Sequence, residues 1–378
     1  MIGSGKLVDL LRRRTASNVF IPQIDGLRFY AVVAVLVFHC AGYLCTPNRN
    51  PAATAAAATW VAGLAKAGHS GVELFFVISG FVLGLPFARA AAGVAPKVSL
   101  RRYFLRRITR LEPPYIINLL LLSAAMLVLG KATLPWLLPH LLASLTYCHN
   151  LVYGVGSSIN FVAWSLEIEV QFYILAPLLA GLLALRSPSV RAAALAAGMT
   201  LGSTLTCYLT TTEGIPQPLK LTLACFLQYF LAGFAVADWY ARGGDRSERS
   251  SLADALAIPC VVAALVLEQH PVVRAYLLPL AFAGLCFSGL HGRIHSRLVS
   301  TPALVVIGGM CYTIYLYHPF IKSSLGPFIV RMSPPGLPPS AVVLVQLAAF
   351  IAAIVALCVP LFLCFEKPFM AVGARRTR

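Results

Sequence analysis

Charged residues are scarce in this chain of 378 residues, and acidic residues are the scarcest of them. Only 11% of the residues are charged, and 13 acidic residues face 30 lysines and arginines. A soluble domain carries about 25% charged residues. Apolar residues make up 59% of the chain, and its mean hydropathy is +0.80. This composition excludes an ordinary soluble domain and predicts a multi-pass membrane protein.

The cysteine pattern signals neither a disulfide framework nor a zinc site. None of the ten cysteines forms a C-x-x-C pair, and most stand singly inside apolar runs, where they behave as small hydrophobes. His291 and His295 have a spacing that metal ligands use, but they flank Arg293 in a segment that we expect to be a cytoplasmic loop. Solvated charge is the better interpretation, and we expect no bound metal.

Apolar runs long enough to cross a bilayer recur along the chain. We predict an all-α polytopic transmembrane helix bundle of about ten spanning helices. They cover approximately residues 28–44, 71–87, 113–129, 161–185, 192–209, 219–239, 252–267, 272–290, 303–323 and 340–364.

The chain is expected to divide into three segments. Residues 1–27 are expected to form a cytoplasmic N-terminal segment, residues 28–366 the membrane domain, and residues 367–378 a basic cytoplasmic tail. The stretch 134–154 is hydrophobic, but prolines and polar residues interrupt it. We expect a short interfacial or re-entrant element there rather than a span.

The distribution of positive charge sets the orientation of this bundle. With the N-terminus inside and ten spans, 23 of the 30 lysines and arginines fall on the inner side. The positive-inside rule therefore favours ten helices with both termini in the cytoplasm. The same rule explains the net charge of +17 without a nucleic-acid partner.

Arg28 and His39 stand out in the first apolar run. They are eleven positions apart, so on a helix they share one face at an axial separation of about 16 Å. Ionisable groups inside a membrane usually face a cavity and function there. Taken alone, Arg28 is better explained as an anchor whose charge reaches the headgroups, and for His39 a hydrogen bond between helices is as good an explanation as catalysis.

Several carboxylates and a second histidine fall in the same outer half of the membrane. They are Glu73, Glu167, Glu169 and His318. A histidine paired with a carboxylate is the arrangement that general-base catalysis needs. Glu167 and Glu169 point about 200° apart on a helix, so at most one of them faces a given cavity.

Structural explanations compete with these catalytic ones. Ser70 and Glu73 have the spacing of a capping box, as do Thr109 and Glu112. His318 could form a hydrogen bond across helices, and we weigh that equally with a role at the site.

A strongly basic segment, RRYFLRRITRLEPPY, precedes the third expected helix. Its arginines could bind lipid headgroups and set the topology, or they could bind the phosphates of a cytosolic ligand through paired hydrogen bonds. Because proline suits the first turn of a helix, we expect that helix to begin after Pro113 and Pro114.

These motifs together resemble the acyltransferase-3 family of membrane acyltransferases. The resemblance covers nearly the whole chain and rests on IDGLRFYAVVAVLVFH, GVELFFVISGF, RRYFLRRITRLEPPY, WSLEIEVQFYILAP and CYTIYLYHPF with FEKPF, in this order. Glu169 matches the first acidic position of the fourth motif, whereas Val170 replaces a frequent second glutamate. Phe29 stands where glycine is usual, and FEKPF places Glu366 near the end of the last helix.

The resemblance implies an O-acyltransferase that uses cytosolic acyl-CoA, by default acetyl-CoA, to acylate a hydroxyl of an extracytoplasmic or lipid-linked carbohydrate, in a bacterial inner membrane. It implies catalytic roles for His39, Glu169 and Glu73. The implied donor-binding residues are Arg28, Arg101, Arg102, Arg106, Arg107 and Arg110. The implied acceptor-binding residues are Trp164, Glu167, His318 and Tyr173.

Two other classes of protein remain open from the sequence. A proton-coupled transporter or flippase could use His39 and the carboxylates as a proton relay. A lipid-binding scaffold would tolerate substitution of its buried charges.

Overall fold

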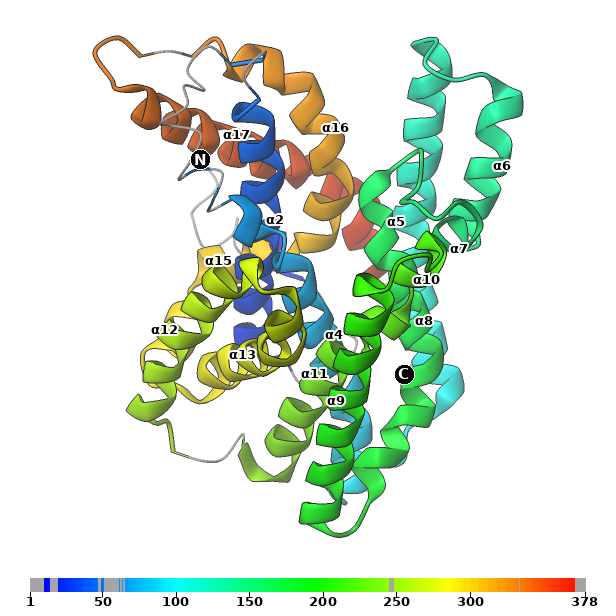
Figure 1. Ribbon diagram of the computed structural model, residues 1–378, viewed down its shortest axis with the longest axis vertical. Coiled ribbons are helices and arrows are strands. Elements are labelled where there is room, and N and C mark those ends of the chain that lie inside the picture. Colours follow the sequence, from blue (N-terminus) through cyan, green and yellow to red (C-terminus); the bar gives the residue numbers. More distant parts are fainter. Residues whose placement is uncertain are drawn as a thin grey trace.

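The computed structural model describes residues 10–13, 20–46, 49–50, 61, 63, 65–244, 248–332 and 334–370. Across these residues the chain is helical, and its only extended pairing is an isolated bridge between Ser250 and Gly292. Figure 1 shows the resulting bundle, in which helices far apart in sequence lie side by side. The expected all-α class is confirmed.

Eight described helices are long and apolar enough to span a membrane. Their main elements are α2 (Pro22–Leu44), α4 (Gly71–Ala91), α5 (Leu100–Val128), α8 (Trp164–Leu179), α9 (Pro188–Thr211), α12 (Ser251–Val266), α13 (Pro271–His291) and α17 (Pro339–Leu361). Adjoining helical turns lengthen four of these spans, to Ala65–Ala91, Phe161–Ala184, Ser251–Gln269 and Pro339–Met370. A ninth span forms if α15 (Pro302–Gly309) and α16 (Cys311–Ile329), which meet at a bend of 69°, are counted together. The protein is therefore a multi-pass membrane protein.

The helix expected over residues 219–239 is broken into shorter pieces. It comprises α10 (Gln217–Lys220), a 3₁₀ turn (Leu223–Cys225) and α11 (Leu227–Trp239), which has 13 residues. This region therefore does not count among the eight to nine long helices, although its hydropathy resembles theirs.

Helices α4 and α11 form the centre of the bundle. A β-carbon at Gly80 would lie 2.2 Å from the carbonyl oxygen of Phe230, and one at Gly233 would lie 2.1 Å from that of Val77. Glycine at both positions thus lets the two backbones touch, which is a common way to pack helices in membranes. In the span that contains α4, 67% of the apolar stretch is buried, whereas in the span that contains α12 only 17% is buried.

A second glycine contact fixes the start of α2. A β-carbon at Gly26 would lie 1.8 Å from the carbonyl oxygen of Val299 in α14 (His295–Val299), and one at Gly308 in α15 would lie 1.7 Å from that of Asp25. The first turns of α2 are therefore wedged between α14 and α15.

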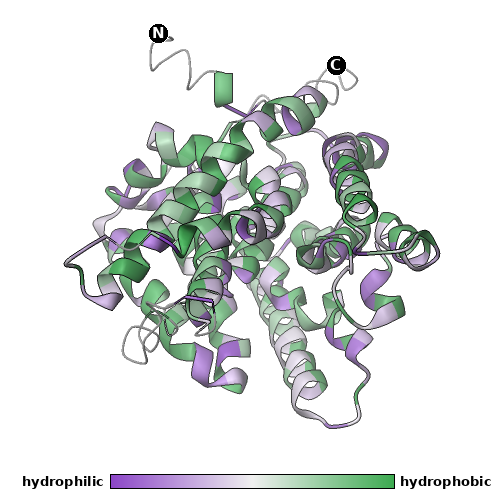
Figure 2. Cartoon of the chain, turned by 90° about the horizontal axis from the view of Figure 1, so that it is seen from above, coloured by the Kyte–Doolittle hydropathy of each residue, from purple (hydrophilic) through white to green (hydrophobic). Residues whose placement is uncertain are grey.

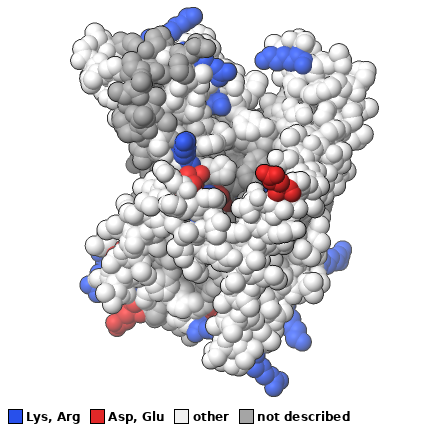
Figure 3. All heavy atoms as spheres, in the orientation of Figure 1, with Lys and Arg blue, Asp and Glu red and all other residues white. Residues whose placement is uncertain are grey.

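The outside of the bundle is apolar. Leu178, Leu252 and Val128 are more than three-quarters exposed, and many other large hydrophobic side chains are more than a third exposed. Hydrophobic residues dominate the helices in Figure 2. Such exposure suits a lipid environment and not water. Figure 3 shows a hollow between the side of the molecule that holds α16 and α17 and the side that holds α5 and α6 (Leu134–Leu145).

The expected start of the third helix is wrong. Helix α5 begins at Leu100 and continues through Pro113 and Pro114. Arginine and leucine favour helix strongly, so the helix extends across the basic segment, and each proline removes only one backbone donor inside it. The arginines are therefore helical residues rather than part of a loop.

Neither expected capping box forms. Thr109 lies within α5, where its hydroxyl donates to the carbonyl of Leu105, and the hydroxyl of Ser70 donates to the carbonyl of Ala67. The glutamates of these motifs, Glu73 and Glu112, are thereby left available for other contacts.

The stretch 134–154 folds into two short helices, α6 and α7 (His149–Tyr153). The longer, α6, has 12 residues. It is too short to span a bilayer, which agrees with the expected interfacial or re-entrant element.

Candidate functional site

A cavity of about 450 Å³ is lined by seven cationic side chains. No acidic residue is among its described lining, so it forms a strongly electropositive site, which we call the basic cavity. Its cations come mainly from α5, with others from α4, from the segment between these helices and from the N-terminal segment. They are Arg13, Arg89, Lys97, Arg102, Arg106, Arg107 and Arg110.

The helical spacing of α5 explains which arginines face this cavity. Arg102, Arg106 and Arg110 are four residues apart and form one stripe, and all three line the cavity. Arg101 lies about 180° from Arg110 around the helix, is exposed, and does not line the cavity. Four of the five arginines of the basic segment therefore share the site expected for a donor, and Arg101 does not.

A smaller inner cavity of about 90 Å³ continues from the basic cavity toward the middle of the bundle. The two cavities share Val82, Arg107 and Arg110 in their walls. Glu169 of α8 lies in the inner cavity and accepts a hydrogen bond from the hydroxyl of Ser79 on α4. The cavities thus join a cationic surface to a buried carboxylate.

Arg28 lies in the wall of the inner cavity and is only 8% exposed. Its guanidinium donates to Asp25 at 2.6 Å, and Arg13 lies 3.3 Å from the same carboxylate. Asp25 therefore partly neutralises two arginines at this end of the cavities, and it keeps Arg28 buried instead of extended toward headgroups.

His39 and His318 are brought together by α2 and α16. Their ring centroids are 5.0 Å apart, and Phe161 packs edge-on against His39 at 5.4 Å. His318 is fully buried, with Nδ1 lying 2.8 Å from the carbonyl oxygen of Tyr315 and 3.2 Å from that of Ile314. Its Nε2 is buried and has no hydrogen-bond partner among the described residues.

Tyr315 connects the inner cavity to this histidine pair. It lines the cavity, and its ring centroid lies 5.9 Å from that of His318. Its hydroxyl donates to the carbonyl of Val162 at 2.8 Å and lies 2.6 Å from the hydroxyl of Ser165. A continuous series of cavities and side chains therefore runs from the basic cavity to His39.

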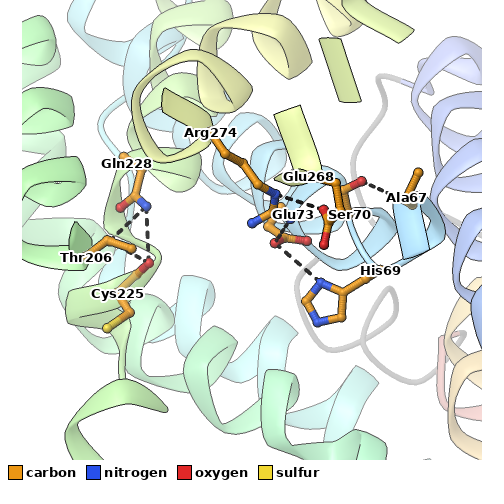
Figure 4. A network of polar contacts seen from close by, with 9 residues as sticks. All are labelled: Ala67, His69, Ser70, Glu73, Thr206, Cys225, Gln228, Glu268 and Arg274. Atoms are coloured by element: carbon orange, nitrogen blue, oxygen red, sulfur yellow. Dashed lines mark hydrogen bonds and ion pairs between the residues drawn. The ribbon is translucent and has the colours of Figure 1, made fainter. Parts of the chain in front are cut away.

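Glu73 belongs to a different network, shown in Figure 4. Its carboxylate accepts from Arg274 of α13 at 2.7 Å and lies 3.8 Å from Nδ1 of His69. Arg274 also lies 3.1 Å from Glu268. Glu73 is thus an ion-pair partner of Arg274 in this structure, and no contact joins it to His39.

Glu167 and Glu169 diverge, as their spacing predicts. Glu167 is buried, and its Oε2 accepts the backbone N–H of Asn150 at 2.8 Å, which attaches α7 to α8. The side-chain amide of Asn150 donates to the carbonyl of Trp164 at 2.8 Å. Of the residues expected to bind the acceptor substrate, Glu167 and Trp164 therefore both contact Asn150 of α7. Tyr173 instead lines the inner cavity with Glu169.

The interpretation of His295 as solvated charge is wrong. His295 is 7% exposed, its Nδ1 lies 2.9 Å from the hydroxyl of Ser288, and its backbone N–H donates to Asp254. This residue lies between the spans, and its burial lowers its pKa. The described residues contain no group of three or more His, Cys, Asp or Glu side chains placed to hold a metal ion.

Some residues of the site escaped the sequence interpretation. Tyr315, Ser165 and Ser79 have no charge, so nothing singled them out. Tyr315 stands three residues before His318, a spacing that puts both side chains on one helical face. That spacing was the available signal.

Comparison with known proteins identifies the family. The family model described as "Acyltransferase domain" matches residues 21–364, nearly the whole chain. The chain belongs to the acyltransferase-3 family. No solved structure matches it.

Individual relatives match a part of the chain. They include a predicted O-acetyltransferase of Staphylococcus aureus (strain COL), 28% identical over 42% of this chain, and YrhL of Bacillus subtilis, named as a predicted peptidoglycan O-acetyltransferase, 29% identical over 44%. The O-acetyltransferase OatA of Staphylococcus aureus is 25% identical over 42%. The matched region spans 24% of the length of each of these relatives.

Proposed function

We propose that this member of the acyltransferase-3 family is a membrane O-acyltransferase. It transfers an acyl group, by default acetyl, from cytosolic acyl-CoA to a hydroxyl of an extracytoplasmic or lipid-linked carbohydrate. The observation that carries the proposal is the continuity of the basic cavity, the inner cavity and the His39–His318 pair. The names of the relatives, which include O-acetyltransferases, support the same chemistry.

The basic cavity suits the phosphate groups of coenzyme A. Arginine binds phosphate through paired, charge-assisted hydrogen bonds, and Arg102, Arg106 and Arg110 line the cavity on a single helical stripe. A volume of about 450 Å³ lies within the range of pockets that bind small molecules and cofactors. The inner cavity would then receive the pantetheine arm and the thioester.

The reaction would take place between Tyr315 and His39. His39 removes the proton from the acceptor hydroxyl while that oxygen attacks the thioester carbonyl. The carbon–sulfur bond then breaks, and the proton passes to the leaving thiolate, so that the products are an ester and free coenzyme A. Glu169, hydrogen-bonded to Ser79, supplies negative charge in the inner cavity during these proton transfers. An acyl-enzyme intermediate would split the same transfer into two steps.

The site of action follows from the topology that we expect. In that topology 23 of the 30 lysines and arginines, including those of the basic segment that lines the basic cavity, lie on the cytoplasmic side, so we expect the donor to bind from the cytoplasm. The membrane is then the inner membrane of a bacterium, and the acceptor approaches from the outer side. Nucleic acid has no part in this proposal.

The experiment uses the purified full-length chain in liposomes with radiolabelled acetyl-CoA and a chitooligosaccharide as the acceptor probe. We expect label on the oligosaccharide and release of free coenzyme A by the wild type. The His39→Ala variant should bind acetyl-CoA but transfer no label.

Binding and turnover distinguish the competing functions. Transfer by a folded His39→Ala variant would remove the proposed base. Absence of both acetyl-CoA binding and thioester turnover in the wild type would contradict the acyltransferase and favour the transporter or flippase.

A further inference from the structure

The strongest unexplained feature of the site is the free ring nitrogen of His318. Nε2 of this residue is buried and has no hydrogen-bond partner among the described residues. Buried polar atoms are nearly always hydrogen-bonded, because an unpaired one loses its contacts with water. An exception inside a site therefore points to a partner that arrives during function.

The backbone of α16 determines the protonation of the His318 ring. Nδ1 lies 2.8 Å from the carbonyl oxygen of Tyr315 and 3.2 Å from that of Ile314. Carbonyl oxygens only accept hydrogen bonds, so Nδ1 carries the hydrogen in the neutral ring and Nε2 carries a lone pair. His318 thus offers an acceptor on the side of its ring away from its own helix.

His39 is the donor whose ring packs against that of His318. The two ring centroids are 5.0 Å apart, and hydrogen bonds between catalytic groups are often long before substrate binds. Lys322 also acts electrostatically on His39, but its ammonium group has only donors, and His69 turns Nδ1 toward Glu73 at 3.8 Å. No carboxylate contacts His39 among the described residues, since Glu73 pairs with Arg274.

We propose that His318 is the positioning residue for His39, with Nε2 accepting the N–H of the His39 ring. This inference rests on the proposed acyl transfer. The contact leaves the other nitrogen of His39 unprotonated and able to take the proton of the acceptor hydroxyl. When His39 holds both protons, one still points at Nε2 of His318. That proton does not move, and the other goes to the leaving thiolate.

This arrangement differs from the pairing of histidine with a carboxylate that the sequence suggests. A neutral imidazole takes the place of the carboxylate as the acceptor. It selects the tautomer of His39 and holds the orientation of its ring without placing a negative charge in the membrane, where such a charge is costly.

Two substitutions separate the two nitrogens of His318. The amide oxygen of glutamine can occupy the position of Nε2, so His318→Gln keeps the acceptor. The amide of asparagine occupies the position of Nδ1, so His318→Asn keeps the bond to the α16 backbone and removes the acceptor. We expect His318→Asn to lower kcat roughly 100-fold or more, because His39 then loses the orientation that it needs as the base, and His318→Gln to lower it less than about 10-fold.

The measurements are kcat, KM for acetyl-CoA and the thermal midpoint of each variant in the liposome assay. A positioning role predicts that KM and the thermal midpoint of His318→Asn stay close to those of the wild type while kcat falls. The opposite order, with His318→Asn active and His318→Gln inactive, would show that only the Nδ1 contact matters and would overturn the inference.

The same assay separates this inference from the proposed function. If the wild type transfers acetyl and both His318 variants match it, the inference fails and the acyltransferase stands. If the wild type neither binds nor turns over acetyl-CoA, the acyltransferase fails, and the positioning role fails with it.

Discussion

Glu167 and Glu169 are two residues apart in α8, yet they contact different parts of the protein. Glu167 accepts the backbone N–H of Asn150 at 2.8 Å, whereas Glu169 accepts from Ser79 in the inner cavity. One helix therefore holds a structural carboxylate and a cavity carboxylate side by side, and substitutions should separate their roles.

The change Glu169→Gln should lower kcat without unfolding the protein. Glutamine keeps an acceptor for Ser79 but removes the negative charge from the inner cavity, and loss of an acid–base group lowers the rate roughly 100-fold or more. The measurement is acetyl transfer together with the thermal midpoint. Wild-type turnover by a folded Glu169→Gln variant would exclude this carboxylate from the chemistry.

Glu167→Ala is the matched control, and it should act on stability. It leaves the N–H of Asn150 without its acceptor, and an unpaired buried donor costs about 1–3 kcal/mol. We expect a lower thermal midpoint, with kcat per folded molecule close to that of the wild type. A large loss of kcat at an unchanged midpoint would instead place Glu167 in the reaction.

The arginine stripe of α5 should govern the affinity for acetyl-CoA. Arg106 lines the basic cavity and Arg101 does not. A charge-assisted hydrogen bond is worth about 1.5–3 kcal/mol, so Arg106→Ala should weaken binding roughly 10-fold or more. Arg101→Ala, which removes the same charge from the same helix, should change it less than about threefold. Titration of acetyl-CoA in detergent tests both, and equal effects would show that the net charge matters and not the cavity.

The pair formed by Glu73 and Arg274 should be structural. Their atoms are 2.7 Å apart, and Glu73 is 1% exposed. Removing one partner of a buried pair costs up to about 3–5 kcal/mol, and Glu268, which lies 3.1 Å from Arg274, would still compensate part of the remaining charge. Glu73→Gln should therefore lower the thermal midpoint, and the double change Glu73→Gln with Arg274→Gln should recover much of it. If the double variant is stable but inactive, Glu73 takes part in catalysis after all.

Stability should fall below about pH 6.5, partly because of His295. Burial lowers the pKa of this histidine in the folded protein below its ordinary value of 6.5. The unfolded chain therefore binds more protons between these two values, and the free energy of unfolding decreases as the pH falls through that window. Thermal unfolding from pH 5 to pH 8 measures this slope.

The variant His295→Asn checks the assignment of that slope. Asparagine can keep the contact with Ser288 but does not titrate, so the slope below pH 6.5 should become shallower. His270→Asn, which removes a histidine at an exposed position, is the matched control. His149 is also buried outside the spans, and its pKa is likewise lowered by burial, so some slope should persist in the His295 variant.

Much of the fold could be predicted because long apolar runs in a membrane protein have few alternatives to helix. Arg28 and His39 occupy one helix as expected, and the divergence of Glu167 and Glu169 follows from helical geometry alone. The start of α5 could not be predicted, because Pro113 fits equally well at a first turn or inside a long helix. Local spacing also suggested capping boxes that the packed structure does not use.

The partners of the site residues were harder to predict than their positions. Glu73 pairs with Arg274, which lies 201 residues later in the chain, and His39 lies against His318. Such contacts depend on which helices pack together and on their relative positions along the helix axes. The hydropathy of the sequence predicts neither. Gly26 and Gly308 fix the position of α2 against α14 and α15, but this role can be recognised only once the neighbouring helices are known.

Gly26 and Gly308 also restrict which helices of the enzyme can move relative to one another. Because the backbone of α2 rests directly on α14 and α15 at Gly26 and Gly308, no layer of side chains can slide there, and the three helices should move as one rigid body. Helix α5 packs mainly against α6, α16 and the π-helical turn Phe362–Glu366 that follows α17, toward one edge of the molecule (Figure 1). Substrate admission should therefore rely on a swing of α5, which would carry its arginines with it while the Arg28 end of the site stays still.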